Sequence, residues 1–143
     1  MEYHFELHQE DEGWFWAECV ELKGCLSDGD RVEDLKLRLE DALNLYLNEP
    51  IGSNMVFPLP DKKLDENTSF LRIPVKSNVA FAMLIRQYRI SNRMTLDQAR
   101  EKIGLKNRNS YVKLESAGNP TMDTISMVIK SFPEINLNEC FSR

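Results

Sequence analysis

The sequence predicts an α+β protein in which a small β-β-β-α-β domain, residues 1–75, is followed by an all-α domain, residues 76–143. Apolar and polar residues alternate near the N-terminus, as in a half-buried strand, whereas apolar residues recur every three or four positions in the second half, as in amphipathic helices. Residues 1–75 hold 7 Lys and Arg against 17 Asp and Glu, and residues 76–143 hold 11 against 6. The first part is therefore acidic, with a balance of −10, and the second is basic, with +5.

Three strands are expected at the start of the first domain. Residues 3–8 alternate apolar and polar side chains, residues 10–13 form a polar turn, and residues 14–20 form an aromatic-rich strand. Both alternating sets of this second strand are apolar, which predicts burial on both of its faces. One face can meet the helix of the same domain, and the other needs a partner. A short third strand is expected to end at Ser27.

A helix, a loop and a fourth strand complete the first domain. The helix, residues 31–47, is predicted by apolar residues at spacings of three and four: Val32, Leu35, Leu39, Ala42, Leu43, Tyr46 and Leu47. A polar segment interrupted by prolines and a glycine predicts a long loop over residues 48–69. Residues 70–75 resume a strand, and Pro74, which lacks an N–H group, restricts it to a sheet edge or a strand end.

Four helices are expected in the second domain. The first is capped by Ser77 or Asn78, and the last covers residues 121–132. Between them, one helix begins after a capping Thr95 and ends at Gly104, and a shorter one covers residues 107–116. The residues expected to face the core are Phe81, Leu84, Ile85, Tyr88, Ala99, Ile103, Tyr111, Leu114, Met122, Ile125, Val128 and Ile129.

The two central helices fit the helix-turn-helix arrangement, in which a glycine-containing turn leads to a short polar helix. The start of that helix can enter the major groove of DNA, where Arg binds guanine and Asn binds adenine in bidentate geometry. The candidates on this helix are Asn107, Arg108, Asn109, Ser110 and Lys113. The candidates for phosphate contacts are Thr95, Gln98 and Lys106. A plain helical bundle with solvated polar residues is also compatible with the helix spacings.

The second domain resembles the Xre/lambda-repressor-like family between Met94 and Ile125. The residues that carry the resemblance are Thr95, Ala99, Gly104, the polar helix 107–113, Glu115, Gly118, Pro120 and Ile125. The chain departs from the family by an apparent one-residue insertion between Gly104 and Glu115 and by a one-residue shortening between Glu115 and Pro120. The resemblance implies a DNA-binding module, and the departures affect the register of individual base contacts.

The first domain resembles HicB antitoxins over residues 13–25, 27–30 and the helix that follows. The family stretch usually ends in Pro-Asp-Leu-Pro-Gly-Cys; here Val20 and Lys23 replace both prolines and Glu21 replaces Asp. This resemblance implies a partial ribonuclease-H-like domain that binds and blocks a small HicA-type ribonuclease toxin. Together, the two resemblances imply an antitoxin of a type II HicAB-like system that also represses its own operon.

The expected partners are a HicA-like mRNA interferase toxin and operator DNA, bound by a dimer or a higher homo-oligomer. Trp14 and Trp16 are the candidates for toxin binding, because aromatic anchors concentrate in interfaces. The edge strand at residues 71–75 can join two subunits by β-pairing. No catalytic residue, metal or cofactor is expected. Since neither a membrane span nor a signal peptide is evident, a cytoplasmic location is expected.

Two other functions stay open at this point. A one-component regulator would sense a small molecule with its first domain and change its DNA affinity when the ligand binds. A metal-dependent nuclease would need converging carboxylates, and the leading strands contain Glu6 and Glu18. His4 and His8 do not supply a shared metal site, because four residues of strand separate them by about 13 Å at ~3.3 Å per residue.

Overall fold

The computed structural model describes residues 1–142 and has a mixed α+β fold. Within these residues it contains a four-stranded antiparallel sheet and five α-helices, together with three short 3-10 helices. None of the helices in this part of the chain combines the length and the apolar character that a transmembrane segment requires.

The chain forms two compact units. Unit 1 comprises Met1–Leu47 and Phe57–Val75, with Ser142 from the C-terminus, and unit 2 comprises Asn48–Val56 and Lys76–Phe141. The change of unit after Val75 coincides with the change of charge along the sequence. Residues 48–56, which were expected to be part of a loop in the first domain, belong to unit 2.

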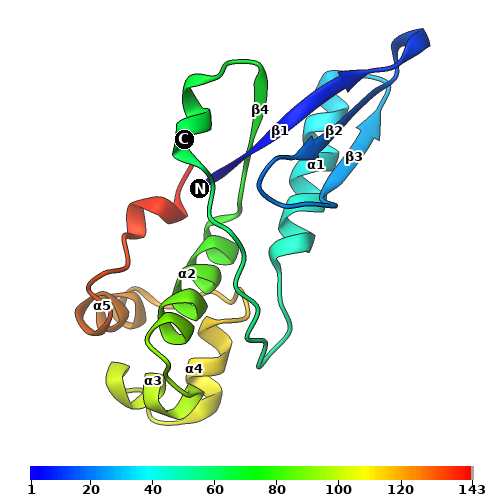
Figure 1. The fold of residues 1–143 in the computed structure, drawn as a ribbon. Coiled ribbons are helices and arrows are strands. Elements are labelled where there is room, and N and C mark those ends of the chain that lie inside the picture. The colour runs from blue at the N-terminus through cyan, green and yellow to red at the C-terminus, as the bar shows by residue number, and fades with distance from the viewer. Residues whose placement is uncertain (143) are drawn as a thin grey trace. The chain divides into compact units, whose positions relative to one another are not determined.

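The sheet of unit 1 has the strand order β3-β2-β1-β4 (Figure 1). Its strands are β1 (Glu2–Gln9), β2 (Phe15–Cys19), β3 (Leu26–Gly29) and β4 (Phe70–Pro74). Neighbouring strands are antiparallel, and Phe5 in β1 lies opposite Cys19 on one side and Leu71 on the other. The four expected strands are confirmed, and β4, which contains Pro74, is an edge strand as expected.

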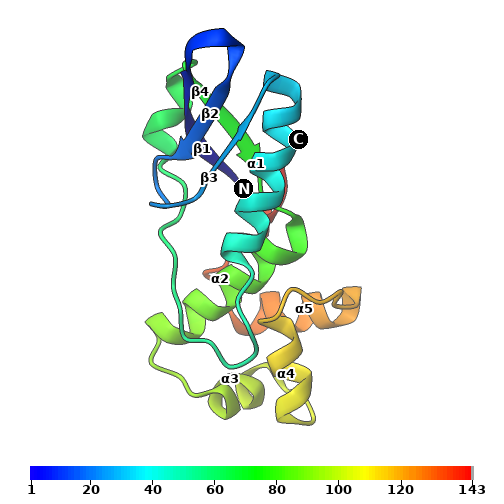
Figure 2. The same ribbon diagram turned by 90° about the vertical axis from the view of Figure 1, so that its right-hand side faces the viewer.

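Helix α1 (Val32–Leu47) covers one face of the sheet (Figure 2). Its buried leucines recur every four residues and therefore form one stripe along the helix. The core between the helix and the sheet is fully buried and consists mainly of Tyr3, Phe5, Ala17, Leu35, Leu39, Leu43 and Leu47. Burial of each leucine side chain contributes about 1.5–3 kcal/mol. This stripe fixes α1 on the sheet.

The face of β2 that α1 does not cover is partly open to solvent, so the expected burial of this face against a partner stays a prediction. Ala17 and Cys19 are buried, on the face that α1 covers. Trp16 on the other face is only half-buried, and Trp14 lies before the strand and is 42% exposed. Among the described residues of unit 1, α1 is the only α-helix, and the aromatic side chains of the other face of the hairpin lie at the surface.

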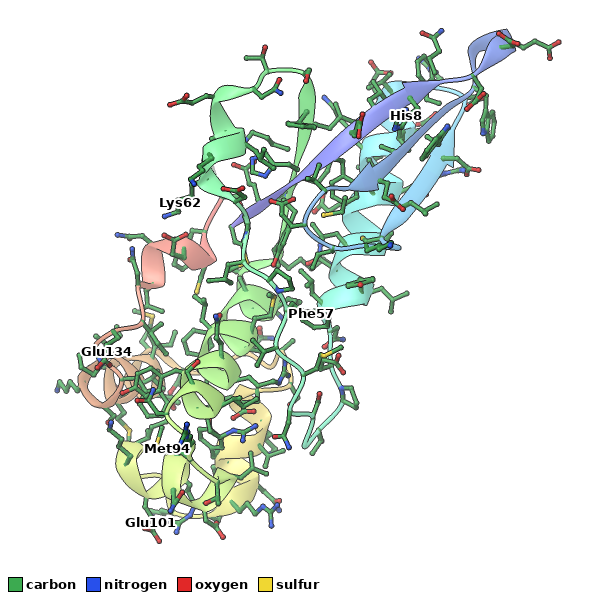
Figure 3. The ribbon with its side chains drawn as sticks, viewed as in Figure 1. His8, Phe57, Lys62, Met94, Glu101 and Glu134 are labelled. Carbon is green, nitrogen blue, oxygen red and sulfur yellow. The ribbon has the colours of Figure 1, made fainter. Side chains whose placement is uncertain are left out.

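The connection from α1 to β4 is more ordered than the expected loop. It contains a 3-10 helix, η2 (Lys62–Glu66), which begins where the Asp61 side chain accepts a hydrogen bond from the Lys63 N–H group at 3.0 Å. Phe57 is buried, with its ring 5.6 Å from that of Tyr46. Figure 3 labels Phe57 and Lys62 along this segment. Residues 57–69 therefore pack as part of unit 1.

Unit 2 contains the helices α2 (Ser77–Ser91), α3 (Leu96–Ile103), α4 (Arg108–Leu114) and α5 (Met122–Ser131). Each lies within a few residues of an expected helix. The capping assignment for α2 was wrong, because Lys76 is the N-cap residue and Ser77 lies inside the helix. The Asn78 side chain instead donates a hydrogen bond to the carbonyl of Ala117 at 2.9 Å.

The core of unit 2 is centred on side chains from all four helices: Ile85, Tyr88, Ala99, Tyr111, Val128 and Phe132. The rings of Tyr88 and Phe132 stack with their centroids 4.3 Å apart. Val128 and the C-cap residue Phe132 are four positions apart and both fully buried, so they define the face of α5 that packs against the core. The expectation for Met122 and Ile129 was therefore wrong: they are 80% and 43% exposed.

Candidate nucleic-acid interface

Helix α3 begins with a complete capping box. The Thr95 hydroxyl accepts a hydrogen bond from the Gln98 N–H group at 3.1 Å, and the Gln98 side chain accepts one from the Thr95 N–H group at 2.9 Å. Each bond satisfies a backbone donor that the first turn of a helix leaves without a partner. Both residues were expected to hold phosphates. Their side-chain oxygens serve the cap, which leaves the exposed NH₂ group of Gln98 as a donor for a phosphate.

A glycine in the left-handed conformation ends α3 and turns the chain toward α4. Gly104 has a φ of 92°, which costs other L-residues about 1–2 kcal/mol. The N–H groups of Gly104 and Leu105 donate to the Arg100 carbonyl at 3.0 and 3.1 Å. The Arg100 guanidinium donates to the Leu105 carbonyl at 3.0 Å. The expected role of Gly104 is confirmed, and Arg100 closes the turn from the helix side.

Helix α4 is capped by Asn107. The Asn107 side-chain oxygen accepts hydrogen bonds from the Ser110 N–H group and from the Ser110 hydroxyl, both at 2.9 Å. Asn107 was expected to be the first residue of the helix; it is the residue before it, and α4 starts at Arg108. The cap therefore occupies the hydroxyl of Ser110 and the oxygen of Asn107. Arg108 and Asn109 are the exposed side chains of the first turn.

The exposed polar residues around α4 are arranged along its length. Lys106 precedes the cap, Arg108 and Asn109 lie in the first turn, and Lys113 lies one turn after Asn109 on the same face. The inner face is apolar and buried: Tyr111, Val112 and Leu114. In Figure 3, Met94 marks the turn before α3 and Glu101 the exposed side of α3. The structure thus brings together three cations and one amide that can contact a polyanion.

A buried ion pair anchors the end of α4 to α2. Arg89 donates hydrogen bonds of 2.7 and 2.9 Å to the Glu115 carboxylate, and Arg86 donates one to the Glu115 carbonyl. Arg89 also donates to the Asn54 side chain at 3.0 Å, within the segment 48–56. This cluster was not predicted from the sequence. The signal for it was a pair of arginines three residues apart, directly after the apolar run 79–85 of α2.

The electrostatics of this cluster depend on Glu115. Burial lowers the pKa of Arg86, and the negative charge of Glu115 offsets only part of this effect. Burial acts on Arg89 in the same direction, but the hydrogen bond and the charge of Glu115 outweigh it and raise the pKa of Arg89. Burial also raises the pKa of Tyr111, and the charge of Glu115 adds to this rise. Glu115 is therefore the counter-charge for two buried guanidinium groups.

A second exposed surface lies on unit 1. We define the outer sheet face, opposite α1, by Glu6, His8, Trp16, Glu18 and Leu26. The Trp16 ring stacks on His8 with centroids 4.1 Å apart and donates a hydrogen bond to Glu10 at 2.8 Å. Glu6 and Glu18 lie directly opposite each other on β1 and β2, an arrangement that like charges make unfavourable. Figure 3 labels His8 on this sheet.

The sequence matches no protein-family model and no curated protein.

Proposed function

We propose that the chain is an antitoxin of the HicAB type, which neutralises a small ribonuclease toxin through unit 1 and represses its own operon through unit 2. The observation that carries the proposal is the α3–α4 pair. Two capped helices are joined by a left-handed glycine, and the second exposes Arg108 and Asn109 in its first turn. This geometry fits a helix-turn-helix with α4 as the reading helix. The Xre-like pattern of residues supports the same assignment.

The side chains around α4 divide into two roles in this proposal. Arg108 and Asn109 read bases, because their side chains can form bidentate hydrogen bonds with guanine and adenine. Lys106, Lys113 and the amide of Gln98 hold phosphates, which positions α4 without reading sequence. The net charge of +5 on residues 76–143 favours association with DNA.

The toxin partner is assigned to unit 1 because its surface suits a basic protein. Residues 1–75 carry a net charge of −10, and the outer sheet face combines apolar and acidic side chains. A protein that cleaves RNA needs cations to bind its substrate, so an acidic antitoxin surface complements it and speeds association. Trp16 is the better anchor of the two tryptophans, since its ring is held by His8 and Glu10.

A dimer completes the proposal, because helix-turn-helix proteins usually bind two half-sites about one DNA turn apart. Strand β4 was expected to join two subunits, but it offers little backbone for pairing. Pro74 has no N–H group, and its carbonyl accepts a hydrogen bond from Asn44 at 3.5 Å. The Phe70 N–H group donates to Asn67 at 3.4 Å. The backbone N–H and carbonyl groups of Arg72 are left to pair with a second strand, so side chains must supply most of a contact between subunits along this edge.

The test uses the DNA upstream of the reading frame and the small basic protein that the proposal expects in the neighbouring frame. We expect the purified chain to bind the upstream fragment more tightly than a scrambled fragment of equal length. Co-expression should also restore growth of cells that produce the neighbouring protein. No preference for the upstream DNA, together with no rescue of growth, would refute both parts.

A pair of variants tests the assignment to the outer sheet face. Trp16→Ala should abolish growth rescue and leave DNA binding unchanged. Leu37→Ala is the control, because Leu37 is 65% exposed on α1, which covers the opposite face of the sheet. If both variants rescue growth like the wild-type chain, the toxin binds elsewhere.

A further inference from the structure

His4 is a fully buried histidine held between two carboxylates. Its Nδ1 atom lies 2.7 Å from a Glu21 carboxylate oxygen, and its Nε2 atom lies 2.7 Å from one of Asp65. Glu21 follows β2, whereas Asp65 lies in η2, so the ring connects two segments that are far apart in the sequence. The Glu21 carboxylate also accepts hydrogen bonds from the N–H groups of His4 and Asp61, at 3.1 and 3.0 Å.

Both ring contacts require the charged form of the histidine. A carboxylate only accepts hydrogen bonds, and a neutral imidazole has a single N–H group, so neutral His4 can donate to one carboxylate and not to both. When His4 is neutral, the hydrogen bond to Asp65 is the one that breaks. The Asp65 side chain is 38% exposed and can be hydrated, whereas that of Glu21 is only 6% exposed and is held by two backbone N–H groups.

We propose that His4 is a protonation-controlled latch that ties the η2 part of residues 57–69 to the sheet in its charged form and releases it when the ring loses its proton. This segment joins residues 48–56 of unit 2 to strand β4 of unit 1. The start of the segment stays in place, because the Tyr3 hydroxyl donates a hydrogen bond to the Pro58 carbonyl at 2.6 Å and Phe57 is buried. The release is therefore confined to η2 and the residues up to β4. The latch uses none of the residues proposed for DNA or toxin contact, and His4 lies on the same face of β1 as Glu6 and His8.

The charged groups around His4 favour the protonated form of its ring. Glu21 faces it from the end of β2 and Asp65 from η2. The cross-strand neighbour Arg72 on β4 lies 3.7 Å from Asp65 and 3.0 Å from Glu2. Cys19 on β2 contacts Glu21, and burial raises the pKa of its thiol to about 12. The nearby charges are therefore one guanidinium and three carboxylates, a balance that favours a cationic ring.

The direction of the pH dependence follows from the pKa of His4. Burial lowers this pKa, but the hydrogen bonds to Glu21 and Asp65 outweigh burial and raise it above the ordinary value of 6.5. The latch therefore contributes its full stability below pH 6.5, the value for the unfolded chain. That stability is lost as the pH rises through the higher pKa of the folded state. The release of η2 therefore occurs at a pH above the pKa of His4 in the folded chain.

The experiment measures amide hydrogen exchange and the ring nitrogen signals of His4 on the whole chain between pH 6 and pH 10. The reporters are the Leu64 and Asn67 N–H groups, which form hydrogen bonds at the start and at the end of η2. The reference is the Leu35 N–H group in the first turn of α1, which donates to the Arg31 carbonyl at 2.9 Å. We expect the protection factors of the η2 reporters, corrected for intrinsic exchange, to fall roughly tenfold in step with deprotonation of His4. The reference should not change.

Asp65→Asn is the matched variant, because a side-chain amide can donate to the neutral ring nitrogen and so keep η2 attached without the proton. Its η2 reporters should stay protected through the His4 titration. His8→Gln assigns the ring signals, since the chain has two histidines. The latch is refuted if η2 protection in the wild-type chain is unchanged while His4 titrates, or if Asp65→Asn loses protection over the same pH range.

Discussion

At the scale of single residues, the buried charged groups that hold each unit together were not evident from the sequence. Arg89 and Glu115 are 26 positions apart and lie in segments that otherwise supply apolar core residues. A periodicity argument treats a charged residue in an apolar stripe as an interruption, because it cannot show that two such residues meet. Only the packing of α2 against the end of α4 brings this pair together. The same limit applies to His4, Glu21 and Asp65.

The buried ion pair leads to a stability prediction. Glu115→Gln removes the counter-charge of two buried arginines, and we expect the free energy of unfolding of unit 2 to fall by about 3 kcal/mol, since breaking a buried pair leaves an uncompensated charge. Denaturant unfolding followed by the helical circular dichroism signal measures it. Both tryptophans lie in unit 1, so their fluorescence reports the other unit separately.

Glu101→Gln is the control for this prediction, because the Glu101 side chain is 69% exposed and forms a surface pair with Arg100 at 3.2 Å. Such pairs contribute about 0–1 kcal/mol. Equal losses of stability in the two variants would show that the buried cluster does not anchor α4.

At the scale of elements, the turn between α3 and α4 requires glycine at position 104 because of its left-handed backbone conformation and not because a side chain would lack room. A Cβ atom at Gly104 would meet only the Met127 side chain, at 3.8 Å. Gly104→Ala should therefore lower the free energy of unfolding by about 1–2 kcal/mol through backbone strain alone. Gly104→Asn should cost less, because Asn tolerates the left-handed region better. Thermal unfolding of the two variants tests this order, and a larger loss for Asn would contradict it.

Variants of the N-cap residue Asn107 distinguish its contribution to stability from a contact with DNA. Asn107→Ala removes the cap and should lower the free energy of unfolding by about 1 kcal/mol, whereas Asn107→Ser keeps a side-chain oxygen at the N-cap. Because the Asn107 oxygen is held by Ser110, we expect Asn107→Ser to retain most of the DNA affinity of the wild-type chain. Fluorescence anisotropy with labelled upstream DNA measures it. If both variants lose affinity equally, the Asn107 amide contacts DNA directly.

At the scale of the whole molecule, the sequence predicted the order of strands and helices well, because both kinds of periodicity are strong and the boundaries carry clear signals. Thr95 and Gly104 mark the two ends of α3, and Pro74, which was expected at a sheet edge or a strand end, is the last residue of the edge strand β4. The assignment of residues 48–56 to unit 2 was not predictable, since it follows from a contact between Asn54 and Arg89. Loop composition contains no information about which core a segment joins.

The candidate site was predictable in its location and less so in its detail. The segment between Thr95 and Lys113 was recognised from helix ends and polar composition, both of which are local. The roles of Asn107 and Ser110 were assigned to base contacts because the sequence does not show which hydrogen bonds a polar side chain makes within its own turn. Capping and DNA contact favour the same residue types at a helix start, so only the geometry distinguishes them.

The double variant Arg108→Ala/Asn109→Ala tests whether the two units have separate tasks. Its binding to upstream DNA and its rescue of growth against the neighbouring small basic protein are measured side by side with the wild-type chain. We expect the preference for upstream over scrambled DNA to fall at least tenfold, since each bidentate base contact contributes about 1–3 kcal/mol, while growth rescue is unchanged. An unchanged preference for upstream DNA, or a loss of growth rescue by this variant, would contradict the account.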